Sequence, residues 1–181
     1  MIENKFAITL EGLQETSKRV IRETPRFRKT SIVMPLVIVV SIAIVYVMQT
    51  NIPLPLLLLI GVALLAYTVN LLLKTPEKMA VNIFNDMKRK YGEPTTHTRM
   101  TEGGILLMDQ NEDGDDDRMF PFSSIRLVFA TAHFIVAMTD TNRAVVFRKD
   151  SFLSGSAKEL IAMFRAHCPQ AKFDKTLNNI T

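Results

Sequence analysis

The chain has 181 residues, 48% of them hydrophobic, and carries 22 Lys and Arg against 18 Asp and Glu. A mean hydropathy of +0.15 is too high for an ordinary soluble domain, so the apolar residues must be concentrated somewhere in the chain. From Lys74 onward, 15 basic and 14 acidic residues nearly balance, which excludes the strongly basic surface of a nucleic-acid-binding protein. The single cysteine, Cys168, excludes an internal disulfide and agrees with a reducing compartment.

Residues 1–30 are predicted to form a cytoplasmic N-terminal strand followed by a basic juxtamembrane segment. Phe6, Ile8 and Leu10 alternate with other residues, which is the period of a strand. The following "LQETSKRVIRETPRFRK" mixes apolar and basic residues. It is interpreted either as a partial helix in the lipid headgroup region or as a charged lead-in that only sets topology. Pro25 argues against one unbroken helix here.

Residues 31–73 contain no charged side chain. Two apolar runs, Ser31–Met48 and Ile52–Leu73, would be about 27 and 33 Å long as helices, which matches a hydrocarbon core of roughly 30 Å. The rest of so short a chain cannot cover both helices on every side, so we predict a two-helix transmembrane hairpin. A cleaved signal peptide does not explain a first run that begins behind a long polar segment and is followed at once by a second.

Basic residues flank this hairpin on both sides. Six Lys and Arg lie from Lys18 to Lys29 and five from Lys74 to Lys90, whereas the connecting "QTNI" has none. The positive-inside rule therefore predicts that both termini lie on the cytoplasmic side of the membrane, with the lipid bilayer as a partner.

Small and polar residues within the spans give limited further information. The spans contain no Asp, Glu, Lys, Arg or His, at least one of which a transport pathway or proton relay normally needs. Gly61, Ala63 and Ala66 lie in the second span, but no two of them are four residues apart, so the small-xxx-small motif is missing. Ala63 and Ala66 could let the two spans pack against each other. A homo-oligomer stays open, with little support from this pattern.

Residues 74–181 are predicted to form a cytoplasmic α+β domain. A helix is expected over 75–91, with Thr75 as its cap and Pro76 in its first turn. It either follows a bend or continues stiffly from the second span. From Glu93 to Lys149 the apolar period becomes that of strands. The predicted strands are 95–100, 104–109, 118–122, 125–130, 133–138 and 143–147.

The strands are joined by short turns, which indicates an antiparallel meander. Ser156 and Glu159 then make a capping box for a last helix whose apolar face contains Leu160, Ile161 and Phe164. We therefore predict a strongly curled antiparallel sheet closed by a C-terminal helix, which is a PH-like outline.

Several stretches of the chain resemble the YcxB-like family of bacterial membrane proteins. They are the "FAITLE" strand, the two-span hairpin, "NIFNDMKRKYG" at residues 82–92, "FPFSSIRLVF" at 120–129 and "VVFRKDSF" at 145–152. Arg148 stands where the family usually has proline. The resemblance covers nearly the whole chain and implies a membrane hairpin with a terminal YcxB-like domain, located in a bacterial inner membrane. The family has no established catalytic residues or ligand, so the resemblance implies no mechanism.

The stretch from Asp109 to Asp117 has six acidic residues in nine positions and begins like an EF-hand loop. The candidate ligands at alternate positions are Asp109, Asn111, Asp113, Asp115 and Asp117. Position 12 of such a loop would be Phe120, which cannot bind calcium, and the flanks are strand-like instead of helical. The simpler interpretation is a hairpin turn whose extra acids keep it solvated. We predict no metal site and no cofactor.

No constellation of acid, base and nucleophile is visible in the sequence. His97, His133 and His167 lie on separate predicted elements without metal-ligand spacing, and Cys168 lies on the apolar face of a helix. Glycine-rich phosphate loops are also missing. The protein is therefore predicted not to be an enzyme.

These observations predict a non-enzymatic, membrane-anchored interaction or adaptor module with a protein partner and no nucleic acid. Arg143, Arg148, Lys149 and Phe152 form the predicted contact patch, and a solvated edge is the alternative interpretation of these residues. Two other functions stay open. One is an immunity-type protective membrane protein, and the other is a weak calcium or lipid sensor that acts through the acidic loop 109–117.

Overall fold

The computed structural model describes residues 2–48, 53–108 and 118–180. The chain divides into two compact units. The hairpin unit is Ser17–Met79, and the folded unit combines Met1–Thr16 with Ala80–Thr181. The boundaries fall inside helix α1 (Leu10–Glu23) and helix α3 (Leu54–Tyr91), so both helices contribute residues to each unit.

In the hairpin unit, Pro25 separates two helices. Helix α1 ends at Glu23, and helix α2 (Pro25–Met48) begins at the proline itself. Proline suits the first position of a helix because its fixed φ is helical and its missing N–H would have no intrahelical partner there. The prediction that Pro25 prevents one unbroken helix is confirmed.

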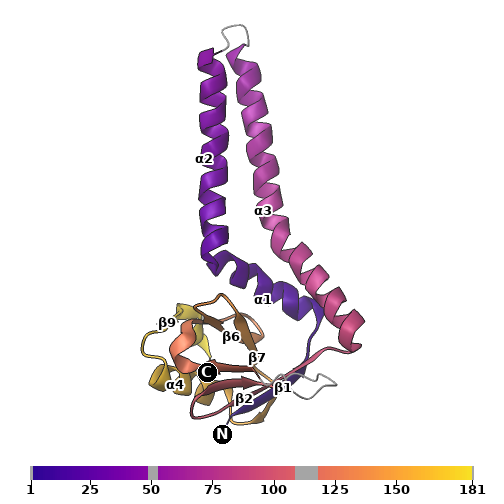
Figure 1. Ribbon diagram of the computed structural model, residues 1–181, viewed down its shortest axis with the longest axis vertical. Coiled ribbons are helices and arrows are strands. Elements are labelled where there is room, and N and C mark those ends of the chain that lie inside the picture. The colour runs from indigo at the N-terminus through magenta and orange to yellow at the C-terminus, as the bar shows by residue number, and fades with distance from the viewer. Residues whose placement is uncertain (1, 49–52, 109–117, 181) are drawn as a thin grey trace. The chain divides into compact units, whose positions relative to one another are not determined.

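Helices α2 and α3 run side by side as an antiparallel pair (Figure 1). They approach closely at Gly61, where an added Cβ would lie 2.5 Å from Cδ1 of Ile42. Gly61 and Thr68 are buried, whereas Ala63 and Ala66 are exposed. The residue that brings the helices together is therefore Gly61, and the two alanines are not at this contact.

Helix α3 continues without interruption through Pro76. Thr75 does not cap a new helix. Its Oγ1 donates a hydrogen bond to the carbonyl of Leu71 at 2.7 Å, in the manner of a threonine inside a helix. Of the two alternatives for this segment, the stiff continuation is the one observed.

The folded unit contains two sheets, so the prediction of a single curled sheet is wrong. The five-stranded sheet has the order β4–β3–β2–β1–β8 and the four-stranded sheet the order β7–β6–β5–β9. Along the chain they contain β1 (Glu3–Ala7), β2 (Thr95–Met100), β3 (Gly104–Leu107), β4 (Arg118–Pro121), β5 (Ile125–Ala130), β6 (Phe134–Thr139), β7 (Ala144–Arg148), β8 (Phe152–Ser154) and β9 (Lys172–Phe173). The meander is broken between β4 and β5, where the short 3₁₀ helix Phe122–Ser124 replaces a hairpin turn.

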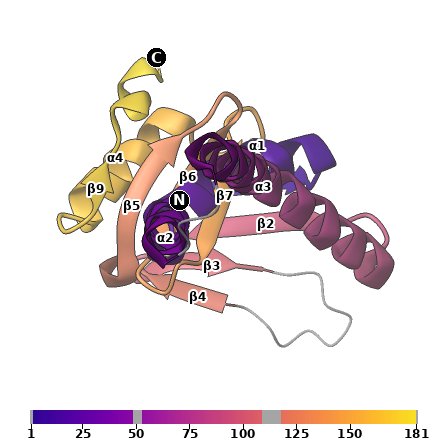
Figure 2. The ribbon, with the colours of Figure 1, turned by 90° about the horizontal axis from the view of Figure 1, so that it is seen from above.

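The N-terminal strand β1 lies inside the five-stranded sheet. It pairs with β2 from Glu3↔Arg99 to Ala7↔Thr95 and with β8 on its other side. The whole α1–α3 segment is therefore an insertion between two paired strands, and it leaves and re-enters the sheet at the neighbouring residues Ala7 and Thr95. Figure 2 shows β2, β3 and β4 as successive neighbours in this sheet.

The core of the folded unit joins both sheets to helix α4 (Ala157–His167). Every residue of β6 is buried, because this strand is central in its sheet and is covered on both faces. Phe147 of β7 meets Phe164 of α4 edge to face, with ring centroids 6.0 Å apart. The predicted cap of α4 is confirmed, since the Ser156 side chain accepts a hydrogen bond from the backbone N–H of Glu159.

Candidate functional site

The first half of helix α1 belongs to the folded unit and lies against Phe134 of its four-stranded sheet. Thr9 caps the helix: its Oγ1 accepts a hydrogen bond from the N–H of Gly12 at 3.1 Å. An added Cβ on Gly12 would lie 2.8 Å from Cζ of Phe134, so only glycine lets the helix approach this ring so closely. Thr16, one turn further on, is buried, and its hydroxyl donates to the Gly12 carbonyl.

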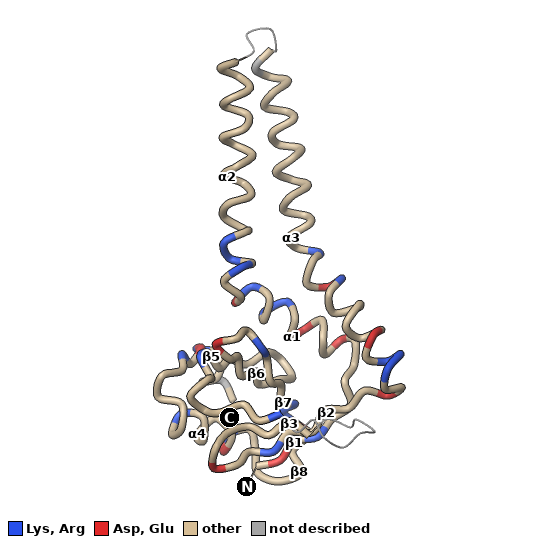
Figure 3. Tube along the Cα trace, viewed as in Figure 1, with Lys and Arg blue, Asp and Glu red and all other residues tan. Residues whose placement is uncertain are grey.

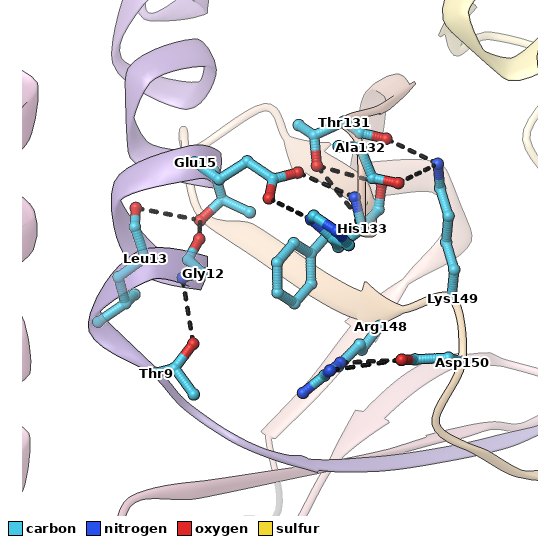
Figure 4. A network of polar contacts seen from close by, with 12 residues as sticks. Thr9, Gly12, Leu13, Glu15, Thr131, Ala132, His133, Arg148, Lys149 and Asp150 are labelled. Carbon is cyan, nitrogen blue, oxygen red and sulfur yellow. Dashed lines mark hydrogen bonds and ion pairs between the residues drawn. The ribbon is translucent and has the colours of Figure 1, made fainter.

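A polar clasp holds this helix to the turn between β5 and β6. We use the name for Glu15, Thr131, Ala132, His133 and Lys149. Oε1 of Glu15 accepts a hydrogen bond from the backbone N–H of His133 at 2.9 Å, and Oε2 lies 2.8 Å from His133 Nδ1 (Figure 4). From the other side, Nζ of Lys149 donates to the carbonyls of Thr131 at 2.7 Å and Ala132 at 2.9 Å. The turn is thus fixed between an acid on α1 and a base that follows β7.

The carboxyl group of Glu15 is electrostatically adapted to this position. Its partial burial raises the pKa, but hydrogen bonds from the Thr131 side chain and from His133 favour the ionised form more strongly. The net effect is a pKa below the ordinary value of 4.5. Glu15 is therefore ionised at neutral pH and acts as the acceptor of the clasp.

An apolar pocket of about 160 Å³ lies between the start of α1 and the sheets. Phe6 of β1, Leu13 of α1 and Phe134 and Val146 of the four-stranded sheet contribute to its walls. The rings of Phe6 and Phe134 are tilted against each other, with centroids 5.7 Å apart. No ionisable residue lines this pocket. The arrangement is suited to holding a small apolar group and offers no acid or base for chemistry.

A buried asparagine connects the two sheets close to this region. Asn4 is fully buried on β1; its Nδ2 donates to the carbonyl of Arg148 at 2.8 Å, and its Oδ1 accepts from the Arg148 N–H at 3.0 Å. The side-chain amide thus behaves like one residue of a neighbouring strand. It satisfies both backbone groups at the end of β7 and fixes that strand relative to β1.

The predicted contact patch is divided in the structure. Arg148, Lys149 and Phe152 lie close in sequence at one end of β7, while Arg143 precedes the opposite end of the same strand. Arg148 forms an ion pair with Asp150, with Nε 2.8 Å from Oδ1 (Figure 4). Lys149 belongs to the clasp, and Phe152 packs partly against the core. Three of the four residues thus have intramolecular roles, and Arg143 is the exposed member of the set.

The candidate cation ligands Asp109, Asn111, Asp113, Asp115 and Asp117 lie outside the described residues. Within the described ranges, no group of three or more His, Cys, Asp or Glu could hold a metal ion.

The three histidines have separate structural partners. His97 forms an ion pair with Glu3 of the adjacent strand, His133 belongs to the clasp, and His167 stacks on Phe122 with centroids 5.1 Å apart. Burial raises the pKa of the Cys168 thiol to about 11, so this cysteine is protonated at neutral pH.

Sequence reasoning named Lys149 as a contact residue and considered His133 as a metal ligand, but it did not predict the clasp or the pocket. The alternation of Phe6, Ile8 and Leu10 extended the predicted strand too far, since β1 ends at Ala7 and α1 begins at Leu10. One signal for this helix was present in the sequence. A cap residue, Thr9, is followed three residues later by Gly12, whose missing side chain permits a close helix contact. Asn4 gave no signal, because a buried asparagine and an exposed one look alike in a strand.

The chain matches no protein-family model, no curated protein and no solved structure. The structure itself defines a folded α+β unit with mainly antiparallel sheets, joined to two helices that are long and apolar enough to cross a membrane.

Proposed function

We propose that this protein is a non-enzymatic, membrane-anchored interaction module of a bacterial inner membrane, with a cytoplasmic folded unit that binds a protein partner. We include its resemblance to the YcxB-like family in this proposal, together with the part of the PH-like outline that consists of antiparallel strands followed by a C-terminal helix. The observation that supports the proposal best is the exposure of apolar side chains along α2 and α3.

Helix α2 contains no buried residue, although its most apolar window has a mean hydropathy of 2.7. Large apolar side chains are exposed along the helix; that of Val47, for example, is 77% exposed. Each fully exposed valine or leucine forgoes about 1.5–3 kcal/mol of burial free energy in water. A bilayer provides that burial for both helices without any partner protein.

The distribution of charge gives this anchor a direction. Lys and Arg gather at the start of α2 and beyond the apolar part of α3, and the helix segments between them are uncharged (Figure 3). Positive charge on one side of both helices favours an orientation with both termini in the cytoplasm. The folded unit would then be confined to the membrane surface, where proximity strengthens even a weak contact with a membrane partner.

Site-specific photocrosslinking in native membranes tests this proposal. A photoreactive amino acid is placed at Arg143 or at Leu153, both exposed on the folded unit, and at Val39 in α2 as the matched control. We expect mass spectrometry to identify one protein at stoichiometric yield from at least one position on the folded unit, and lipid or small proteolipid adducts from Val39. Crosslinks that join only copies of this chain at every position would contradict the adaptor function.

A charge-reversal series tests the contact patch separately. Arg148→Glu removes the ion pair with Asp150, whereas Arg148→Glu combined with Asp150→Arg restores an ion pair of reversed polarity. If Arg148 contacts the partner, both variants reduce the crosslinking yield. If Arg148 has only its intramolecular role, the double variant recovers the yield of the unchanged protein.

A further inference from the structure

We propose that the pocket beneath helix α1 is a binding site for a neutral hydrocarbon group of about the size of benzene. The inference does not rest on the adaptor function, because it follows from the lining, the size and the rigidity of the pocket within the folded unit.

The lining determines the chemical class of the ligand. Its walls are mainly apolar, with Phe6, Ile8, Leu13 and Phe134 among them, and it contains no charged or amide side chain. A charged ligand would lose its hydration there without gaining a partner of opposite charge, which is strongly unfavourable. A hydrocarbon loses nothing of that kind and gains dispersion contacts with every wall.

The hydroxyl groups of the lining restrict the ligand further. Thr9 and Thr16 line the pocket, but their hydroxyls are engaged with the backbone of Gly12. Thr96 also lines it, and its side chain has no hydrogen bond to another described residue. The Thr96 hydroxyl can therefore form a hydrogen bond with one polar atom of a ligand that is otherwise hydrocarbon.

The volume determines the size of that group. An enclosed apolar cavity of about 150 Å³ stays free of water and binds benzene or xenon. The pocket beneath α1 measures about 160 Å³ and is partly open to one side, so a benzene-sized group fits and a longer chain could extend outward.

The walls are held in place without the ligand. Gly12 abuts Phe134, the Glu15–His133 pair fastens α1, and Asn4 fixes β7 against β1. A pocket that is already formed does not require the protein to reorganise on binding, which favours affinity. Because α1 forms one wall, a bound ligand also stabilises the docked position of this helix.

Methyl NMR of the full chain in lipid nanodiscs tests the proposal, with benzene as the probe. Leu13, Leu107 and Val146 report on the pocket, while Leu153 on β8 and Val39 on α2 report on benzene in solvent and in the bilayer. We expect saturable shifts at the methyl groups of the three pocket residues and only small, linear shifts at those of the other two residues. Linear shifts at all five positions would overturn the proposal, because they would show partitioning without a site.

Two pocket-filling variants provide the control. Val146→Phe places a larger side chain in the pocket and should weaken benzene binding at least tenfold, whereas Leu153→Phe makes the same kind of change outside the pocket and should leave binding unaltered. If the folded unit of Val146→Phe loses its dispersed NMR spectrum, this variant does not fold. Thr96→Leu, which fills the pocket from β2, is then used instead of Val146→Phe. Unchanged saturable binding in the filled variant would overturn the assignment of the site.

The same samples distinguish two sources of the hydrocarbon. Nuclear Overhauser contacts between lipid acyl protons and the Leu13 methyl groups, lost as benzene is added, would show that a lipid chain occupies the pocket. Saturable benzene binding without such contacts would show that the natural ligand is a small diffusible molecule. Both results support the site, and each identifies one source.

Discussion

Strand β6 and the apolar part of helix α2, residues 31–48, have similar apolar compositions and opposite environments. All six residues of β6 are buried within the folded unit, whereas none of the 24 residues of α2 is buried. The folded unit buries its apolar side chains with its own sheets and with α4, whereas the apolar side chains of α2 stay exposed. In the proposed membrane orientation, the two units follow the same hydrophobic effect with different solvents, the protein interior for one and lipid for the other.

A charged residue in the middle of α2 should give the largest effect and tests this comparison directly. We expect Val39→Arg to reduce membrane insertion by about 2.5–3.5 kcal/mol, because an arginine at the centre of a span must lose its hydration. The measurement is the fraction of protein retained in membranes after carbonate extraction. Leu153→Arg is the matched control, since Leu153 is 63% exposed on the folded unit, where a surface arginine costs within about 0.5 kcal/mol. Equal effects at both positions would contradict the division into two solvents.

The polar bridge between the sheets should be the next most sensitive feature. Asn4→Ala leaves the N–H of Arg148 without its partner and removes the shorter of two hydrogen bonds to the Arg148 carbonyl, which also accepts from the Ser151 N–H at 3.3 Å. We expect the free energy of unfolding to fall by about 2 kcal/mol. Hydrogen exchange of the β7 amides in the full chain measures the loss of protection. Lys5→Ala, one position along the same strand and exposed, should leave that protection unchanged. A loss of the same size in both variants would argue against the bridge.

The substitution Gly12→Ala should change the stability in opposite directions for a docked and for a free helix α1. Alanine is favoured over glycine in a helix by about 1 kcal/mol, so Gly12→Ala would stabilise a free α1. In the docked helix the new Cβ meets Phe134, and overpacking costs about 1–3 kcal/mol, so we expect a net loss of about 1 kcal/mol. The thermal unfolding of the full chain in nanodiscs measures the sign. In a Phe134→Leu background the same substitution should be neutral or stabilising, because the ring is gone.

The smallest expected effect concerns the clasp and its dependence on pH. The pKa of Glu15 is lower in the folded protein than its ordinary value, so ionised Glu15 stabilises the docked α1 above about pH 4.5. This stabilisation is lost as the pH falls through the lowered pKa of the folded state. Glu15→Gln should remove about 0.5–1 kcal/mol at pH 7, a modest value because the His133 side chain is 70% exposed.

The free energy of unfolding is measured against pH for Glu15→Gln and for the unchanged protein. The difference between the two curves gives the contribution of the Glu15 carboxyl group. The pKa of Glu3 is also lowered, mainly by its hydrogen bond to His97, and contributes equally to both profiles. Glu11→Gln, on the exposed side of the same helix, is the control and should shift neither the stability nor its pH dependence. A flat difference between pH 3 and pH 7 would contradict the role of Glu15.

Local patterns in the sequence were sufficient to predict most elements of the fold. The predicted strands Thr95–Met100 and Ile125–Ala130 coincide with β2 and β5, and the capping box of Ser156 begins α4 where it was expected. Each of these follows from a period or a cap that is contained within a few consecutive residues. The three-residue β8 and the two-residue β9 were missed because such short strands show no period.

Such local patterns could not predict the candidate site. Glu15 and His133 are 118 residues apart, and Asn4 and Arg148 are 144 residues apart, so only the pairing of β1 with β2 across the inserted hairpin brings them together. The meander pattern did not predict the division into two sheets either. Whether two successive strands pair by hydrogen bonds depends on which strands lie side by side in the folded chain.

The sequence alone thus determined two long apolar helices, the charges that flank them and the alternation of the strands, because these properties are local and depend on residue type. The tertiary structure decided the division into two sheets, the docking of α1 and the pocket beneath it. Those features depend on contacts between distant residues, whose free energy is gained only after the chain has closed the loops between them.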